Sequence, residues 1–352
     1  VLSDVSQFTT CTKDNCSITS VSASKTTFNC SNIGDNTVTI TVRDAKGNTT
    51  IKTAKVRILD NRAPVVQTRD VALTLDASGN ATLSMAQAEI SSSDNCGIAS
   101  KVLSKTAFDC SNVGTNPVTL TVTDVNGNVT TKTFNVTITD NIAPTVLAKN
   151  LTVALDANGQ ASVSIPQVDN GSFDNCGLTL SLDKLNFDCS NVGVNTVTLT
   201  GTDPSGNSAS ATATVTVIDN TAPQVITQNA TLQIDTNGQA TLSLEDVVVS
   251  ESDNCGIANR SLSKTSFDCS NLGENTVTLT VTDIHGNNFE TDIIITVEDL
   301  VAPTVITKTA TVNLDANGQA TITVADIDNG SSDNCSLTLS LDKLSFDCSD
   351  LG

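Results

Sequence analysis

The sequence Asp94-Asn95-Cys96, followed fourteen residues later by Cys110 within Phe108-Asp109-Cys110-Ser111, is the segment that decides the fold. The Asp-Asn-Cys motif occurs five times, and its cysteines are separated by steps of 80, 80, 79 and 80 residues. They are Cys16, Cys96, Cys176, Cys255 and Cys335. A period of this regularity indicates a string of similar modules rather than one large domain. A catalytic site is made once, whereas a module copied five times supplies length or a multivalent surface.

The boundaries between modules are marked by the motif Asp-Asn-x-Ala-Pro, which begins at Asp60, Asp140 and Asp219 and reappears in altered form at Asp299. Proline fixes φ and removes a hydrogen-bond donor, so a strand begins afresh there. The motif predicts five repeats, called the first to the fifth below, over residues 1–60, 61–140, 141–219, 220–299 and 300–352. Because the linkers are only a few residues long, we expect the repeats to abut and form an extended rod. Both ends of the chain fall inside a partial repeat, so we expect the array to continue beyond them.

Within each repeat the apolar residues alternate with polar ones at strand spacing. The third repeat shows this over 146–155, 161–168, 178–182, 196–200 and 209–218. Hairpin turns are expected at residues 156–160, where Gly159 would take a positive φ, and at residues 203–207. No stretch has helical periodicity. The predicted fold is all-β: a tandem array of immunoglobulin-like antiparallel β-sandwich modules of about 80 residues.

Composition excludes several classes of partner. The net charge of −20 disfavours nucleic acid, whose phosphates are neutralised by Lys and Arg. No run of 18 apolar residues exists, so no membrane insertion is expected within this sequence. The chain has no Trp and no Tyr, so its cores must consist mainly of Val, Leu and Ile.

The eleven cysteines form five spaced pairs plus Cys11. Paired cysteines in small β modules predict disulfides formed in an oxidising compartment, with free buried thiols as the alternative. Zinc is disfavoured, because two thiols in a repeat do not complete a tetrahedral site. The expected disulfide cysteines are Cys16, Cys30, Cys96, Cys110, Cys176, Cys189, Cys255, Cys269, Cys335 and Cys348. Their connectivity, and the partner of Cys11, stay open.

One possible pairing, Cys176 with Cys189, has a geometric requirement. A straight strand between these two cysteines would hold their sulfurs roughly 40 Å apart, whereas bonded cysteines need Cα atoms within about 7 Å. If the two pair, the chain between them must fold back near Asp183.

Acidic residues predict a calcium site at one pole of each repeat. The incoming linker, the loop before the first cysteine and a hairpin turn each supply carboxylate or amide oxygens, which are the ligands that calcium prefers. The candidate ligands are Asp60, Asn61, Asp94, Asp124, Asp140, Asn141, Asp174, Asp203, Asp219, Asn220, Asp253 and Asp283. The competing interpretation is that these residues only form turns and cap backbone amides. The single histidine, His285, lies in one of the turns and is expected to be solvent-exposed variation rather than a catalytic group.

The stretch from Phe108 to Gly114, with the Val-Thr strand ending at Asp124 and Gly127-Asn128 behind it, resembles the HYR-type immunoglobulin-like repeat. The series of Asp-Asn-Cys and Asp-Asn-x-Ala-Pro motifs resembles the repeat region of giant secreted adhesins of the Bacteroidetes, of the Flavobacterium gliding-motility type. The resemblance implies export to the cell surface, a filamentous shape and a role in attachment or gliding. The cysteine positions depart from typical HYR repeats, so no disulfide pattern is carried over.

Taken together, the sequence predicts a non-enzymatic, structural and adhesive region of an extracellular filament on a bacterial cell surface. It would supply reach, stiffness and multivalent attachment to a surface or polysaccharide, and would self-associate into filaments. The alternative is a passive stalk that displays an enzyme or lectin domain located elsewhere in the protein.

Overall fold

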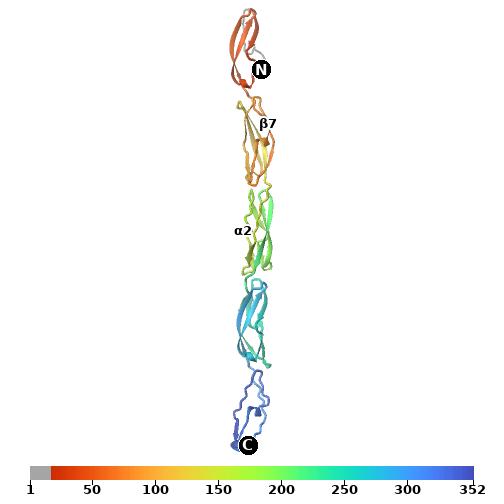
Figure 1. Cartoon of the computed structure of the whole chain (residues 1–352), viewed down its shortest axis with the longest axis vertical. Helices are drawn as coiled ribbons and strands as arrows, with labels where there is room; N and C mark the ends of the chain where they lie inside the picture. Colours follow the sequence, from red (N-terminus) through yellow and green to blue (C-terminus); the bar gives the residue numbers. More distant parts are fainter. Residues whose placement is uncertain (1–16) are drawn as a thin grey trace. The chain divides into compact units, whose positions relative to one another are not determined.

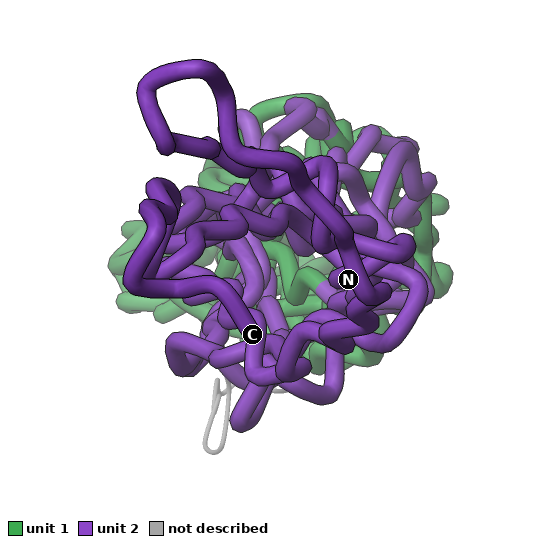
Figure 2. Tube along the Cα trace, turned by 90° about the horizontal axis from the view of Figure 1, so that it is seen from below, with its two compact units in different colours: residues 1–146, 171–180, 200–210 green, residues 147–170, 181–199, 211–352 purple. Residues whose placement is uncertain are grey.

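The computed structural model describes residues 17–352, whose strands and short helices can be followed by colour in Figure 1. The chain divides into two compact units (Figure 2). Unit 1 comprises residues up to 146 together with 171–180 and 200–210, and unit 2 comprises 147–170, 181–199 and 211–352. The second repeat lies wholly in unit 1 and the fourth wholly in unit 2, while the repeat boundaries themselves stay a prediction. Across residues 17–352, no helix has the length and apolar character that crossing a membrane requires.

The second repeat contains three small sheets. Its elements are β4 (Val65–Thr68), β5 (Val71–Thr74), β6 (Asn80–Thr82), α1 (Met85–Ala88), β7 (Glu89–Ser93), β8 (Ile98–Leu103), β9 (Ala107–Asp109), η3 (Cys110–Asn112), β10 (Gly114–Asp124) and β11 (Val129–Thr139). A four-stranded sheet has the order β5-β11-β10-β8, and β4-β7 and β6-β9 form two-stranded sheets. The long strands β10 and β11 pair antiparallel with Gly114 opposite Ile138.

The hydrophobic core of the second repeat lies between these sheets. Val118, Leu120 and Val122 of β10 are fully buried, and they join one cluster with Val66 of β4 and Phe108 of β9. The threonines between them along β10 are half-buried, which is the alternation of a strand with one face on the core. The arrangement is an immunoglobulin-like β-sandwich, so the fold class predicted from the sequence is confirmed.

The fourth repeat has the same plan in unit 2. Its elements are β18 (Gln224–Thr227), β19 (Ala230–Gln233), β20 (Gln239–Thr241), α3 (Leu244–Val247), β21 (Val248–Ser252), β22 (Ile257–Leu262), β23 (Ser266–Asp268), η5 (Cys269–Asn271), β24 (Gly273–Asp283) and β25 (Asn288–Glu298). The sheet order β19-β25-β24-β22 and the pairs β18-β21 and β20-β23 repeat the topology of the second repeat. Phe267 occupies the place of Phe108 and is 1% exposed.

The remaining repeats contribute fewer described elements. The first has β1 (Ile18–Ala23), η2 (Cys30–Asn32), β2 (Gly34–Asp44) and β3 (Thr49–Ile58). The third has β12 (Leu151–Ala154), β13 (Gln160–Ser162), α2 (Ile165–Val168), β14 (Thr179–Leu182), β15 (Asn186–Asp188), η4 (Cys189–Asn191), β16 (Gly193–Thr202) and β17 (Ser208–Ile218). The fifth has β26 (Gln319–Thr321), α4 (Val324–Ile327), β27 (Ser345–Asp347) and η6 (Cys348–Asp350).

Several expectations for the third repeat were wrong in detail. The segment 161–168 ends as the helix α2, a single turn too short for a hydrophobic period, whose start is fixed by a 2.8 Å hydrogen bond from the Ser164 amide to Gln167 Oε1. The turn 156–160 is not a hairpin, because β12 pairs with β17 and β13 pairs with β15. It carries the chain from one sheet to the other. Gly159 has the predicted positive φ, at 71°.

The sheet is also not wholly antiparallel. β5 runs parallel to β11, and β12 and β19 run parallel to β17 and β25 in the same way. In the second, third and fourth repeats, the first strand of the four-stranded sheet therefore joins the last strand at the edge. This parallel pairing was not predicted, because the alternating pattern of a strand carries no information about the direction of its partner.

Candidate functional site at the joints between repeats

The disulfides connect consecutive repeats and do not lie within them. Within residues 17–352 four are formed, each between cysteines 66 residues apart: Cys30–Cys96, Cys110–Cys176, Cys189–Cys255 and Cys269–Cys335. The first two lie inside unit 1 and the last two inside unit 2. The pairing of Cys176 with Cys189 considered from the sequence is wrong. The chain between them does not need to fold back, because each cysteine bonds to a different neighbouring repeat.

Three cysteines are outside these bonds. Within residues 17–352, Cys348 is exposed and has a free thiol, so its expected disulfide is absent. The predictions for Cys11 and Cys16 fall outside the described residues.

The side chain of the asparagine in the Asp-Asn-Cys motif also connects the two repeats, by hydrogen bonds. Asn175 Nδ2 donates to the backbone carbonyl of Asp76 in the preceding repeat at 3.3 Å and to Asp140 Oδ1 at 3.2 Å. Asn254 and Asn334 make the corresponding pairs of bonds at the following joints. On the opposite side of the joint, Gly79 approaches so closely that a Cβ there would lie 2.8 Å from the carbonyl oxygen of Asn175. The disulfide, the side-chain amide of Asn175 and the close approach of Gly79 thus connect the two repeats at one joint.

Beside three of the four disulfides, three aspartates from separate segments converge. They are a linker aspartate, a loop aspartate that precedes the first cysteine, and a turn aspartate. In the three groups, one ligand atom from each residue lies within 4.8 Å of the others: Asp60, Asp94 and Asp124; Asp140, Asp174 and Asp203; Asp219, Asp253 and Asp283. The sequence-based expectation that these three features meet at one pole agrees with this geometry.

The turn aspartates are held as carboxylates by their own turns. Asp203 is 5% exposed, and its two oxygens accept the backbone amide of Asn207 at 2.8 Å and Asn207 Nδ2 at 2.7 Å. Burial opposes the charged form, but the hydrogen bonds from the Asn207 side chain and from backbone amides outweigh it, so the pKa of Asp203 is lowered. The same causes lower the pKa of Asp124 and Asp283. These hydrogen bonds agree with the turn-forming interpretation, and they keep each turn aspartate ionised beside the other two acids of its group.

Several oxygens at the joints are buried and lack a hydrogen-bond partner. At the joint of the second and third repeats these are Asp140 Oδ2, Asp174 Oδ1 and Asn175 Oδ1. The next two joints have Asp253 Oδ2 with Asn254 Oδ1, and Asp333 Oδ1 with Asn334 Oδ1. Buried anionic and carbonyl oxygens without donors are costly unless a cation or donor compensates them. Oxygens of this type suit a hard divalent cation such as calcium, so the residues present fit that ion.

Part of the predicted ligand set is not supported by the structure. Asn61, Asn141 and Asn220 of the linkers are exposed, whereas the buried amide oxygens belong to Asn175, Asn254 and Asn334 of the Asp-Asn-Cys motifs. The linker asparagines follow the buried aspartates directly, and the extended chain turns their side chains outward.

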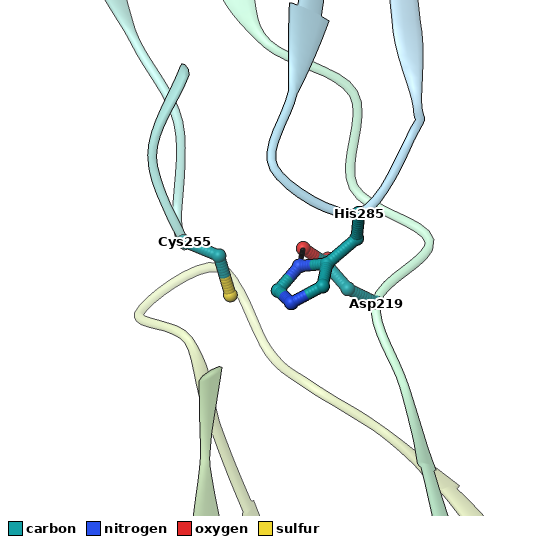
Figure 3. Close-up of side chains that lie close together, drawn as sticks. All are labelled: Asp219, Cys255 and His285. Atoms are coloured by element: carbon teal, nitrogen blue, oxygen red, sulfur yellow. Dashed lines mark hydrogen bonds and ion pairs between the residues drawn. The ribbon is translucent and has the colours of Figure 1, made fainter. Parts of the chain in front are cut away.

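The expectation that His285 is solvent-exposed was also wrong. Its side chain is 16% exposed, and Nδ1 lies 2.9 Å from Oδ2 of the fully buried Asp219 carboxylate. Figure 3 shows the imidazole on its turn between the carboxylate of Asp219 and the sulfur of Cys255. Because that sulfur belongs to the disulfide with Cys189, it is not a thiolate ligand. The turn position that appeared variable in the sequence therefore reaches into the joint.

These features define a class of protein: a tandem array of immunoglobulin-like β-sandwich repeats whose consecutive members are cross-linked by disulfides and by polar joints. No family model matches the chain. It is 29% identical over 294 residues to hyalin of Strongylocentrotus purpuratus, covering 79% of this chain and 24% of hyalin. It is 28% identical over 293 residues to hyalin of Lytechinus variegatus, covering 78% and 54%. The chain thus spans a quarter to about half the length of these relatives, and the similarity supports a HYR-like repeat.

Solved structures with a similar chain course include immunoglobulin domains 1–5 of Sidekick-1, at 9% identity and a TM-score of 0.33, covering 77% of this chain and 68% of that one. Mouse cadherin-23 domains EC22–24 match at 13% identity and a TM-score of 0.29, covering 68% of this chain and 100% of that one. With scores this low, the fold assignment rests on sheet order and core packing alone.

Proposed function

We propose that this chain is the structural and adhesive repeat region of an extracellular filament. The observation that carries the proposal is the covalent linkage of consecutive repeats through disulfides, which resists extension under load. The linkage also requires an oxidising compartment, as found outside the cell. Similarity to hyalin over 79% of the chain supports the same class of extracellular repeat protein. In this role the chain is not an enzyme: its repeated surfaces supply attachment and its joints supply stiffness.

The finer assignment, to a bacterial cell surface and to gliding adhesins of the Bacteroidetes type, rests on the resemblance of the repeated motifs. The partner would be an extracellular surface or polysaccharide, engaged weakly by many repeats at once, or another copy of the filament. The passive stalk is the second candidate, because the joints that give stiffness would serve it equally well.

Adhesion and stalk are separated by a binding experiment on the full 352-residue chain. We expect saturable retention on glass, on immobilised polysaccharide or on cells, with dissociation slowed when the chain is displayed at higher density. A chain that has been reduced and alkylated in denaturant and is kept unfolded serves as the control for non-specific adsorption. Retention equal to that control would assign the passive stalk instead.

We further propose that calcium binds at a joint between repeats. The residues that would hold it are the linker, loop and turn aspartates with the buried amide oxygen of the Asp-Asn-Cys motif, for example Asp140, Asp174, Asp203 and Asn175. A bound divalent cation would neutralise carboxylates that come from three separate segments, and would so fix the linker against the repeat that follows.

Calcium is therefore expected to stabilise the folded chain. At a free calcium concentration about 100 times the dissociation constant, the folded state gains about 2.7 kcal/mol per site. Differential scanning calorimetry in calcium and in a chelator should show a higher Tm with calcium, reversed by the chelator. Identical melting curves in both buffers would contradict the proposal.

A further inference from the structure

Among the positions at which the three joints with a complete set of aspartates differ, one is the second residue after the turn aspartate. This tuning position is Asn126 in the second repeat, Ser205 in the third and His285 in the fourth. All three lie in the same kind of turn, in which the turn aspartate accepts hydrogen bonds from backbone amides. The asparagine two residues after the tuning position donates from its side chain to the backbone carbonyl of the linker aspartate. The turns share these bonds, and the tuning position is where a side chain that contacts the linker carboxylate is present at two joints, as Asn126 and His285, and replaced by Ser205 at the third.

At two joints the tuning side chain supplies a donor to the linker aspartate. Asn126 Nδ2 donates to Asp60 Oδ2 at 2.8 Å. His285 Nδ1 donates to Asp219 Oδ2 at 2.9 Å. In each case a side chain from within the protein occupies the carboxylate oxygen that a cation would otherwise bind, and the buried charge is compensated without an ion.

At the joint of Ser205 that donor is missing. Ser205 is exposed, and Asp140, which is 5% exposed, has no partner for Oδ2. Asp174 Oδ1 and Asn175 Oδ1 are buried and unpartnered at the same joint. Carboxylates of the linker, loop and turn aspartates meet there within 4.8 Å. A buried carboxylate oxygen beside two further acids and an unpartnered carbonyl is the arrangement that a divalent cation satisfies.

We propose that the tuning position decides which joint binds a divalent cation. The joint of Asp140, with Ser205, is a calcium site, whereas Asn126 and His285 replace the ion at their joints by a hydrogen bond to the linker aspartate. This inference rests on the proposal that calcium binds at a joint between repeats, and it specifies which joint does so. A serine admits the ion because its side chain is too short to reach the linker aspartate.

The fourth repeat provides the complementary case. Asp253 Oδ2 and Asn254 Oδ1 are already buried and unpartnered there, in the places of Asp174 and Asn175. Only the Asp219 oxygen is occupied, by His285. Removing the imidazole would therefore leave the same three free oxygens that the joint of Asp140 has, and a second cation site should appear.

The test is calorimetric titration of the full oxidised chain with calcium chloride after removal of bound metal by chelator. Ser205→Asn should weaken the wild-type site by about 10- to 100-fold, the range for changes in groups that support metal ligands. Ser205→Ala is the matched control and should bind as the wild type does, because the serine hydroxyl contacts no ligand. His285→Ser should bind one calcium more than the wild type. In chelator, Ser205→Ala should keep the wild-type Tm, whereas Ser205→Asn should raise it and His285→Ser should lower it, because a buried carboxylate gains or loses its donor. One cooperative unfolding transition in each variant shows that folding is intact.

The outcomes distinguish the two proposals. Heat of binding in the wild type that is unchanged by Ser205→Asn and by His285→Ser would overturn the role of the tuning position while leaving calcium binding in place. Absence of heat in the wild type and in His285→Ser alike would overturn the calcium proposal itself. Weaker binding in Ser205→Asn together with the gain of one site in His285→Ser supports both.

Discussion

Pulled from its two ends, the oxidised chain should release a free contour of only about 50 Å for each repeat that unfolds, at about 3.5 Å per residue. The reason is that each disulfide connects cysteines 66 residues apart, so the chain between them bears no load while the bond is intact. Force passes from Cys96 through the strands to Cys110 and then crosses directly to Cys176, so only the fourteen-residue segment between the first two can extend. After reduction, the whole repeat of about 80 residues can extend, for about 280 Å.

Single-molecule force spectroscopy with and without reductant measures this difference directly. A chain with every cysteine changed to serine is the control, and it should show the long steps in both buffers. Disulfides closed within a repeat, such as Cys176 with Cys189, would instead give oxidised steps of about 230 Å. Steps of that length would contradict the linkage between repeats. In solution the same bonds should contribute about 4 kcal/mol each, by the loop-entropy relation for a loop of this size.

Gly79→Ala should destabilise the joint between the second and third repeats more than a glycine-to-alanine change at any other glycine of the second repeat. A Cβ at this position would lie 2.8 Å from both the Asn175 carbonyl oxygen and Cys110 Sγ, and φ is 75°. Both neighbours are held in place, one by the backbone and the other by the disulfide, so the chain must shift. We expect a cost of about 2–4 kcal/mol, which combines overpacking with a left-handed backbone.

Gly127→Ala is the matched control in the same repeat, because φ is 94° there and nothing lies within 4 Å of the added Cβ. It should cost only the backbone strain, about 1–2 kcal/mol. The measurement is the rate at which dithiothreitol reduces the Cys110–Cys176 bond, followed by mass spectrometry of alkylated peptides. Gly79→Ala should accelerate reduction at this joint, while Gly127→Ala should leave it at the wild-type rate. Equal rates in the two variants would show that the close approach of Gly79 does not restrain the joint.

Much of the repeat was predictable because its signals are local. Alternation along Val118, Leu120 and Val122 reports a strand with one buried face wherever that strand lies. A glycine in an Asp-x-x-Gly turn reports positive φ, as found at Gly159. The single-turn helix α2 was missed because four residues are too few to show a period, although the Ser164 and Gln167 pair is a recognisable cap.

The candidate site was predicted in part. Asp140, Asp174 and Asp203 were expected at one pole, because they lie in the incoming linker, in the loop before the first cysteine and in a hairpin turn. The amide oxygen of Asn175 and the reach of His285 were not assigned, since neither spacing nor composition shows where a side chain points. One signal was available for the disulfides: a spacing of thirteen or fourteen residues across strand-forming sequence holds two cysteines far apart.

The sequence by itself determined the period, the β-sandwich class and the convergence of acidic segments at each joint, because all three follow from patterns repeated every 79 or 80 residues. Only the tertiary structure decided which cysteines bond and which oxygens at each joint lack a hydrogen-bond partner. A disulfide needs two Cα atoms within about 7 Å, and that depends on how one repeat meets the next, not on distance along the chain. Whether Asp140 or Asp219 has a free oxygen depends in the same way on whether Ser205 or His285 reaches across the joint.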